Sequence, residues 1–210
     1  MSHIDARPVL FVISGPSGSG KGTATRWLAE NGGLTRVTTY TTRSPRDTEV
    51  RGIDYHFVDD DEFHRLHDDG TIFEYTRTYS DSLYGSPKVL LDSTDRRPLM
   101  VELDPAGFVR MRAASMRRIV GIFITTVSAD ELRRRIQERG QGSEVAQRLR
   151  IRVDQLTWAW SYDYVLLNDD LESFYADLGT VVRSELLRTA GAQRMLDLRK
   201  ELDPTLVSHA

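Results

Sequence analysis

The chain has 210 residues, of which 40% are hydrophobic and 28% are charged, and its formal net charge at pH 7 is −3. This length and composition predict one well-buried globular core, and the mild negative charge gives no reason to expect a nucleic acid or a membrane surface as a partner. The absence of cysteine excludes disulfides, thiolate metal sites and cysteine nucleophiles, and it fits a reducing cytoplasm.

The N-terminal segment, residues 1–7, lacks the apolar stretch of a signal peptide, and no apolar run in the chain approaches membrane-spanning length. We therefore expect a soluble cytoplasmic protein. The first predicted element is the apolar run Val9–Ile13, which is typical of a buried strand, and a helical pattern follows over Ala24–Glu30.

A glycine-rich loop joins this strand to this helix. It fits the pattern G-x-x-x-x-G-K, but Gly22 stands where serine or threonine is usual. In such a setting the backbone N–H groups and the helix N-terminus bind phosphate, and Lys21 can reach the β- and γ-phosphates. The alternative is a tight turn without a ligand. The predicted ATP-binding residues of the loop are Gly15, Pro16, Ser17, Gly18, Ser19, Gly20, Lys21, Gly22 and Thr23.

The next segment, from about Thr35 to Pro87, breaks the alternation of strand and helix. It contains short aromatic-rich strands at Asp54–Val58 and Ile72–Thr78, with one helix that begins near residues 59–62. We interpret this segment as a small mixed lobe that is inserted after the first strand–helix unit.

Two arginines near the start of this lobe are suited to hold a phosphate. Arg43 and Arg46 lie three residues apart with Pro45 fixing the turn between them, and two forked guanidinium groups match one phosphate dianion. Tyr55 and Tyr84 can each add a hydroxyl donor. The alternative is a solvated turn with surface ion pairs.

A single carboxylate, Glu74, lies inside the apolar strand Ile72–Thr78, where an unpaired charge is costly. One carboxylate can accept both N1–H and N2–H of guanine, whereas adenine presents an acceptor at N1 and is repelled. Glu74 is therefore a candidate reader of guanine. The alternative is that it points to solvent from an alternating strand.

Later in the chain, apolar strands alternate with helical patterns, which predicts the α/β class: a parallel sheet covered by helices on both faces. The predicted strands are Leu99–Leu103, Ile119–Thr125 and Tyr164–Leu167, and the predicted helices are Ala106–Met116, Ala129–Arg139 and Leu171–Arg188. The first of these strands ends in Glu102 and Asp104, carboxylates that can bind magnesium through water or orient an acceptor nucleotide. A plain strand-end turn is the alternative.

These patterns divide the chain into a core and three additions. We expect a core at residues 1–34, 89–139 and 161–190, an inserted lobe at 35–88, a helical region at 140–160 that begins with a polar glycine-containing hinge, and a C-terminal helix and tail at 191–210.

Several motifs together resemble the guanylate kinase family over roughly residues 8–190. They are the phosphate loop, Thr41-Thr42-Arg43-Ser44-Pro45-Arg46, Gly52-Ile53-Asp54-Tyr55-His56-Phe57, Ile72-Phe73-Glu74-Tyr75, Tyr84-Gly85-Ser86 and Asn168-Asp169-Asp170. The resemblance implies a P-loop core with an inserted nucleoside-monophosphate lobe and a mobile lid. It also implies magnesium-dependent phosphoryl transfer from ATP to GMP, giving ADP and GDP.

The resemblance also implies roles for individual residues. Catalysis would use Lys21, Arg43 and the lid arginines Arg135, Arg139 and Arg148, and Asn168 would contact ATP. GMP would be bound by Thr39, Arg43, Arg46, Tyr55, Glu74, Tyr84, Ser86, Glu102 and Asp104. We expect a monomer or homodimer that uses Mg²⁺ with ATP and binds neither nucleic acid nor a membrane.

The sequence departs from the family pattern at a few positions. Gly22 removes the usual magnesium-binding hydroxyl, which Thr23 or water can replace. Thr39 occupies a position where the family usually has serine, and Glu102 occupies one where it usually has aspartate. The loop at residues 79–83 is one residue longer than usual, with Leu83 in place of a common tyrosine. Two other hypotheses remain open: a related kinase with a different phosphate-bearing acceptor, and a non-catalytic binding module of the same fold.

Overall fold

The computed structural model describes residues 5–16, 18–47, 49–78, 81–126, 128, 130, 134 and 156–202. Its core is a five-stranded sheet in the order β2-β7-β1-β8-β9, and a second sheet has the order β4-β3-β6-β5. The core strands are β1 (Val9–Ser14), β2 (Thr35–Arg36), β7 (Leu99–Glu102), β8 (Arg118–Thr125) and β9 (Tyr164–Leu167). All neighbouring core strands pair in parallel, so the predicted α/β class is confirmed.

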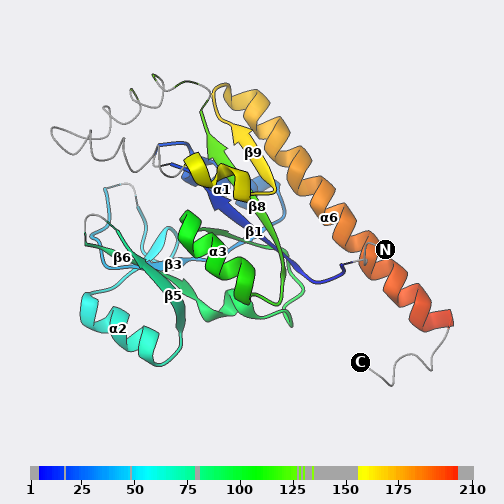
Figure 1. Ribbon diagram of the computed structural model, residues 1–210, viewed down its shortest axis with the longest axis horizontal. Helices are drawn as coiled ribbons and strands as arrows, with labels where there is room; N and C mark the ends of the chain where they lie inside the picture. The colour runs from blue at the N-terminus through cyan, green and yellow to red at the C-terminus, as the bar shows by residue number, and fades with distance from the viewer. Residues whose placement is uncertain are drawn as a thin grey trace.

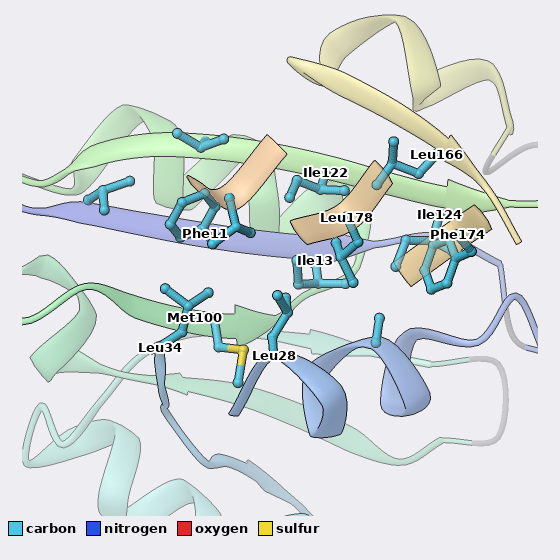
Figure 2. Close-up of a cluster of buried hydrophobic side chains, with 14 residues drawn as sticks. Phe11, Ile13, Leu28, Leu34, Met100, Ile122, Ile124, Leu166, Phe174 and Leu178 are labelled. Carbon is cyan, nitrogen blue, oxygen red and sulfur yellow. The ribbon is translucent and has the colours of Figure 1, made fainter. Parts of the chain in front are cut away.

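The central strand β1 is buried along its whole length because helices cover both faces of the sheet. On one face, α1 (Lys21–Asn31) and α6 (Leu171–Leu202) pack against it, and Figure 2 shows Leu28 of α1 and Leu178 of α6 beside Phe11 and Ile13 of β1. On the other face, α3 (Pro105–Ala114) contributes Phe108 to a second buried cluster. A strand buried on both faces has no polar side to display, which explains its continuous apolar run.

The inserted lobe is built on the second sheet, formed by β3 (Thr39–Thr41), β4 (Tyr55–Phe57), β5 (Ile72–Arg77) and β6 (Leu83–Pro87), with α2 (Asp60–Asp68) against it. Phe63 of α2 is fully buried, and a Cβ at Gly85 would lie only 2.7 Å from its ring. Gly85 is therefore needed for the helix to pack this closely on β6. In Figure 1 the core sheet lies between this lobe, at lower left, and α6, at right.

The lobe begins later than the sequence predicts. Thr35 and Arg36 form β2, which pairs with β7 in the core sheet, so these two residues belong to the core sheet rather than to the lobe. The short strands β3 and β6 and the 3₁₀ helices at Lys88–Leu91 and Trp158–Ser161 were not predicted. Elements of two to five residues carry too few positions for a clear periodicity.

The expected division into a helix that ends at Arg188 and a separate C-terminal helix from residue 191 is wrong, because α6 is one continuous helix of 32 residues. Tertiary contacts hold this part of the helix: Ala192 is buried, and Gln193 accepts a hydrogen bond from Arg96. A glycine inside a helix costs only about 1 kcal/mol relative to alanine, which such contacts offset.

The predicted helix Ala129–Arg139 and the predicted lid at residues 140–160 fall largely outside the described residues, as do Ser17, Arg135, Arg139 and Arg148. Within the part of the chain that the structure describes, none of the helices has the length and apolar character needed to cross a bilayer.

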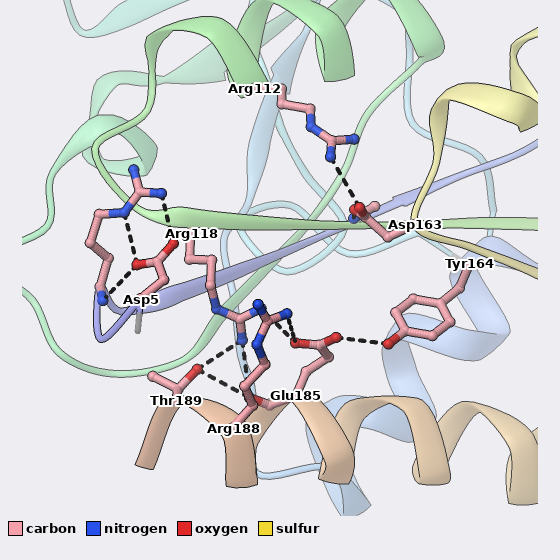
Figure 3. Close-up of polar contacts among 10 residues, drawn as sticks. Asp5, Arg112, Arg118, Asp163, Tyr164, Glu185, Arg188 and Thr189 are labelled. Carbon is pink, nitrogen blue, oxygen red and sulfur yellow. Dashed lines mark hydrogen bonds and ion pairs between the residues drawn. The ribbon is translucent and has the colours of Figure 1, made fainter. Parts of the chain in front are cut away.

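A buried ion pair fastens α6 to the sheet (Figure 3). Glu185 of α6 accepts hydrogen bonds from Arg118 of β8 and from the Tyr164 hydroxyl of β9, the latter at 2.7 Å. The Arg118 guanidinium also donates to the Thr189 hydroxyl at 2.8 Å. Burial alone would raise the pKa of Glu185, but the hydrogen bonds from Tyr164 and Arg118 outweigh it and leave that pKa below its ordinary value.

Glu185→Ala should lower the free energy of unfolding by about 3–5 kcal/mol at neutral pH, because it leaves the buried Arg118 charge without its carboxylate. Because the folded-state pKa is lowered, the contribution of Glu185 is present above the ordinary glutamate pKa of about 4.3 and is lost as the pH falls through the folded-state value. The difference between variant and wild type in urea unfolding should therefore shrink as the pH is lowered below the ordinary glutamate pKa.

Glu201→Ala is the matched control for this experiment, because Glu201 lies on the same helix but pairs with Arg194 at the surface. We expect it to cost less than about 1 kcal/mol. Equal losses of unfolding free energy in Glu185→Ala and Glu201→Ala would contradict the role assigned to Glu185.

Candidate active site

A cavity of about 490 Å³ lies where the core meets the lobe. Parallel strands β1 and β7 both end at this edge of the sheet, which is where ligands bind in open α/β folds. The predicted site residues that line the cavity are Gly15, Gly18, Gly20, Lys21, Gly22, Thr23, Thr39, Arg43, Arg46, Tyr55, Glu74, Tyr84, Ser86, Glu102 and Asp104. The fold therefore brings the loop and the lobe residues to one cavity, although they are far apart in sequence.

The glycine-rich loop adopts a conformation that only glycine permits at two positions. Gly15 and Gly20 have φ angles of 143° and 98°, and a Cβ on either would lie 2.0 Å from a neighbouring atom, the Ile124 carbonyl oxygen or Asn168 Nδ2. Lys21 opens α1, and its Nζ donates to the carbonyl oxygens of Gly15 at 2.7 Å and Pro16 at 2.9 Å. The ammonium group is thus held across the loop, at the positive end of the helix.

Asn168 does not line the cavity but supports the phosphate loop by a hydrogen bond to its backbone. Its Nδ2 donates to the Ser19 carbonyl at 2.8 Å, and its backbone N–H donates to the Thr125 carbonyl at 2.7 Å. The side chain is buried, so it links the end of β9 to the phosphate loop. Contact between Asn168 and ATP stays a prediction.

The two arginines of the lobe differ in their surroundings. Arg43 is largely buried and binds both oxygens of Glu49 at 2.6 Å, while its Nε donates to the Tyr84 hydroxyl at 2.8 Å. Arg46 is 71% exposed, with its guanidinium 3.5 Å from Glu49 and its backbone N–H donating to the same carboxylate at 2.9 Å. Arg43 is therefore no solvated turn residue, and a carboxylate holds the forked geometry that suits a phosphate.

Glu49 was not singled out in the sequence, where a carboxylate in a polar loop resembles an ordinary surface residue. Hydrogen bonds from Arg43 hold the pKa of Glu49 below its ordinary range, so the pair is ionic at neutral pH. Because Glu49 occupies the Arg43 fork, an incoming phosphate dianion has to share or replace this carboxylate.

Tyr55 and Tyr84 complete this end of the cavity. Their rings meet edge-on with centroids 5.8 Å apart, and the Arg43 guanidinium lies 5.0 Å from the Tyr55 ring centroid. Burial raises the pKa of Tyr55, so its hydroxyl remains protonated and able to donate at neutral pH.

Glu74 is buried and faces the cavity, so the alternative that it points to solvent is wrong. Its Oε1 accepts a hydrogen bond from the Ser86 hydroxyl, and its Oε2 accepts one from Arg110 Nε at 2.7 Å. Thr39 and Ser86 are buried beside the same cavity. A Cβ at Gly107 would lie 3.4 Å from Glu74 Oε1, so glycine leaves space in front of this carboxylate.

The two carboxylates at the end of β7 both line the cavity and both bind protein groups. Glu102 Oε1 accepts from the Thr25 hydroxyl at 2.7 Å and from Arg36 at 3.1 Å. Asp104 is the N-cap of α3, and its Oδ1 accepts from the Gly107 N–H at 2.6 Å. Their expected contacts with GMP or magnesium stay predictions. Among the described residues, no group of three or more His, Asp or Glu side chains could hold a metal ion.

Comparisons with known proteins agree with one another. A family model described as "Guanylate kinase" matches residues 6–185. The chain is 34% identical over 192 residues to a guanylate kinase of Rhodospirillum rubrum, covering 89% of this chain and 88% of that protein. It is 34% identical over 191 residues to a guanylate kinase of a Shewanella species, covering 88% and 91%. The crystal structure of guanylate kinase from Anaplasma phagocytophilum matches with a TM-score of 0.71 at 29% identity, covering 87% of this chain and 88% of that chain.

Proposed function

The chain belongs to the guanylate kinase family, and we propose that it catalyses the reaction ATP + GMP ⇌ ADP + GDP. One observation carries this proposal. A single cavity is lined by the phosphate loop with Lys21 and by the lobe residues Arg43, Arg46 and Glu74. Such a cavity has separate groups for a triphosphate, for an acceptor phosphate and for a purine base.

The proposed reaction needs positioning and charge stabilisation more than proton transfer. An oxygen of the GMP phosphate attacks the γ-phosphorus of ATP in line, the new P–O bond forms, and the bond from the γ-phosphorus to the bridging oxygen breaks to release ADP. No general base is required, because the attacking oxygen is already anionic. Lys21 stabilises charge on the transferring group, and Arg43 with Arg46 fixes the attacking phosphate. The lid arginines Arg135, Arg139 and Arg148 would add positive charge on closure.

Magnesium is proposed as a cofactor that arrives with ATP. Mg²⁺ keeps several waters and is usually held by phosphates and one or two protein oxygens, so a site without a carboxylate cage suits it. Gly22 has no side chain to offer, whereas the Thr23 hydroxyl, Glu102 and Asp104 line the cavity. The Ser19 hydroxyl is buried and has no hydrogen-bond partner among the described residues, so the loop also holds an unused polar atom. When bound, the ion would neutralise phosphate charge.

The nucleotides are the partners that this proposal requires. We further propose that the enzyme works in the cytoplasm as a monomer or homodimer, with no nucleic acid or membrane taking part. The formal net charge of −3 favours neither of those surfaces as a partner.

The proposed function is tested by an ADP-release assay with ATP and each of GMP, AMP, CMP and UMP, with buffer alone as the blank. We expect ADP release with GMP that exceeds release with every other monophosphate by at least about a hundredfold in kcat/KM. Release that does not depend on the monophosphate, or that favours another one, would reject GMP as the acceptor.

Arg46→Ala should raise the KM for GMP by about 10- to 100-fold while the affinity for ATP stays unchanged, because a charge-assisted bond to the acceptor phosphate is lost. Arg43→Ala should have the same effect. The loss of GMP-binding free energy in the double variant should be smaller than the sum of the two single losses, because both side chains act on one phosphate. The measurements are calorimetric ATP binding and steady-state GMP kinetics. Loss of ATP binding with an unchanged GMP response would assign both arginines to the wrong nucleotide.

A further inference from the structure

Arg110 reaches from the core into the base-reading part of the lobe. It lies on α3, and its Nε donates to Glu74 Oε2 of β5 at 2.7 Å. Its Nη2 donates to the Tyr75 carbonyl at 3.3 Å and to the Thr76 hydroxyl. Three consecutive residues of β5 are therefore held by one guanidinium that belongs to another part of the fold. Arg110 itself does not line the cavity, so it meets Glu74 from behind.

These contacts leave part of the Glu74 carboxylate free for a ligand. A carboxylate offers about four acceptor sites on its two oxygens. Ser86 uses one site on Oε1. Arg110 donates to Oε2 through Nε and brings Nη2 to 2.7 Å from the same oxygen, but it does so from outside the cavity, so the cavity side of each oxygen is open to a donor. Two parallel donors, such as N1–H and the 2-amino group of guanine, need one free site on each oxygen.

Fixing the plane of this carboxylate requires a rigid partner. The terminal torsion of a glutamate side chain is broad, so one hydrogen bond from a rotating serine hydroxyl does not define it. The guanidinium of Arg110 is planar, and its bonds to the next two residues of β5, Tyr75 and Thr76, prevent it from turning with Glu74. Arg110 thus supplies both the orientation and the compensating charge for a carboxylate whose side chain is 7% exposed.

We propose that Arg110 is a positioning residue for base selectivity, which holds both Glu74 oxygens toward the N1–H and the 2-amino group of the acceptor purine. The inference rests on the proposed function, because it concerns how the GMP acceptor is read. Its measurable consequence is discrimination between GMP and IMP, whose base is the same except that it lacks the 2-amino donor.

The test compares Arg110→Ala and Arg110→Lys with the control Arg112→Ala. Arg112 lies on the same helix and is 45% exposed against 41% for Arg110, but it pairs with Asp163 at 3.0 Å instead of with Glu74. Figure 3 shows the pair of Arg112 and Asp163. Dissociation constants for GMP and IMP are measured by calorimetry, kcat and KM by ADP release, and folding by thermal melting.

For Arg110→Ala we expect the GMP-over-IMP preference to fall by about tenfold, through weaker GMP binding at nearly unchanged kcat and unchanged ATP affinity. Arg110→Lys keeps the charge without the planar fork and should recover only part of the preference. Arg112→Ala should retain it.

A preference in Arg110→Ala within twofold of the wild type would overturn the inference, as would an equal fall in Arg112→Ala. If Arg110→Ala does not fold, Arg110→Lys decides in its place: an unchanged preference overturns the inference and a reduced one supports it. Failure of the proposed function is a separate result, because the wild-type protein would then release no ADP with GMP.

Discussion

Lys21→Ala should lower kcat by about three orders of magnitude or more while the protein remains folded. The Lys21 ammonium is held by the carbonyl oxygens of Gly15 and Pro16, across the loop that is expected to bind the ATP phosphates. In the transition state, negative charge spreads over the transferring phosphoryl group, and a fixed cation at this position stabilises it more than it stabilises the ground state. The loss should therefore appear in kcat, with a smaller change in the KM for GMP.

The measurement is ADP release at saturating ATP and GMP, with thermal melting to check the fold. Lys88→Ala is the matched control, because Lys88 is exposed and does not line the cavity. Turnover of Lys21→Ala within tenfold of the wild type would mean that the loop does not act on a transferring phosphate, even though its geometry resembles a phosphate site.

Most of the core sheet could be predicted from the sequence because its central strands β1, β7 and β8 are almost entirely buried, and β9 is apolar although Val165 and Leu167 are about half exposed. Continuous apolar runs identified β1, β7, β8 and β9 to within about one residue. The strand β2 was missed because Thr35 and Arg36 are polar, and only their pairing with Leu99 and Met100 makes them part of the sheet. Pairing between distant segments leaves no local signal.

The same distinction separates the site residues that were predicted from those that were missed. The phosphate loop and Arg43 belong to local motifs whose spacing carries the chemistry, so the sequence alone indicated them. Glu49 and Arg110 act through partners that the fold brings to them: the Arg110 bond to Glu74 spans 36 positions in the chain. In the sequence, Arg110 is one of two arginines on a helix, and a solvated face is its ordinary interpretation.

Glu74→Gln should raise the KM for GMP by about 10- to 100-fold and weaken the preference for GMP over AMP. The wild-type carboxylate accepts hydrogen bonds from Ser86 and Arg110, and the side of each oxygen that faces the cavity is open to a further donor. An amide has only one oxygen, so its NH₂ group must face either the Arg110 donors or a guanine N–H. Either orientation sets a donor against a donor in a buried site, which costs about 1–3 kcal/mol.

The control for this substitution is Glu62→Gln, which removes the charge of a glutamate that is 37% exposed and paired with Arg65 at 2.6 Å outside the cavity. The affinity for ATP should stay unchanged in both variants, and only Glu74→Gln should bind GMP more weakly. The affinity for AMP should fall less than that for GMP, or rise, because the amide can donate to the N1 acceptor of adenine, which the carboxylate repels. A GMP KM within twofold of the wild type would show that Glu74 does not read the base, and Arg110 would then have no carboxylate to orient.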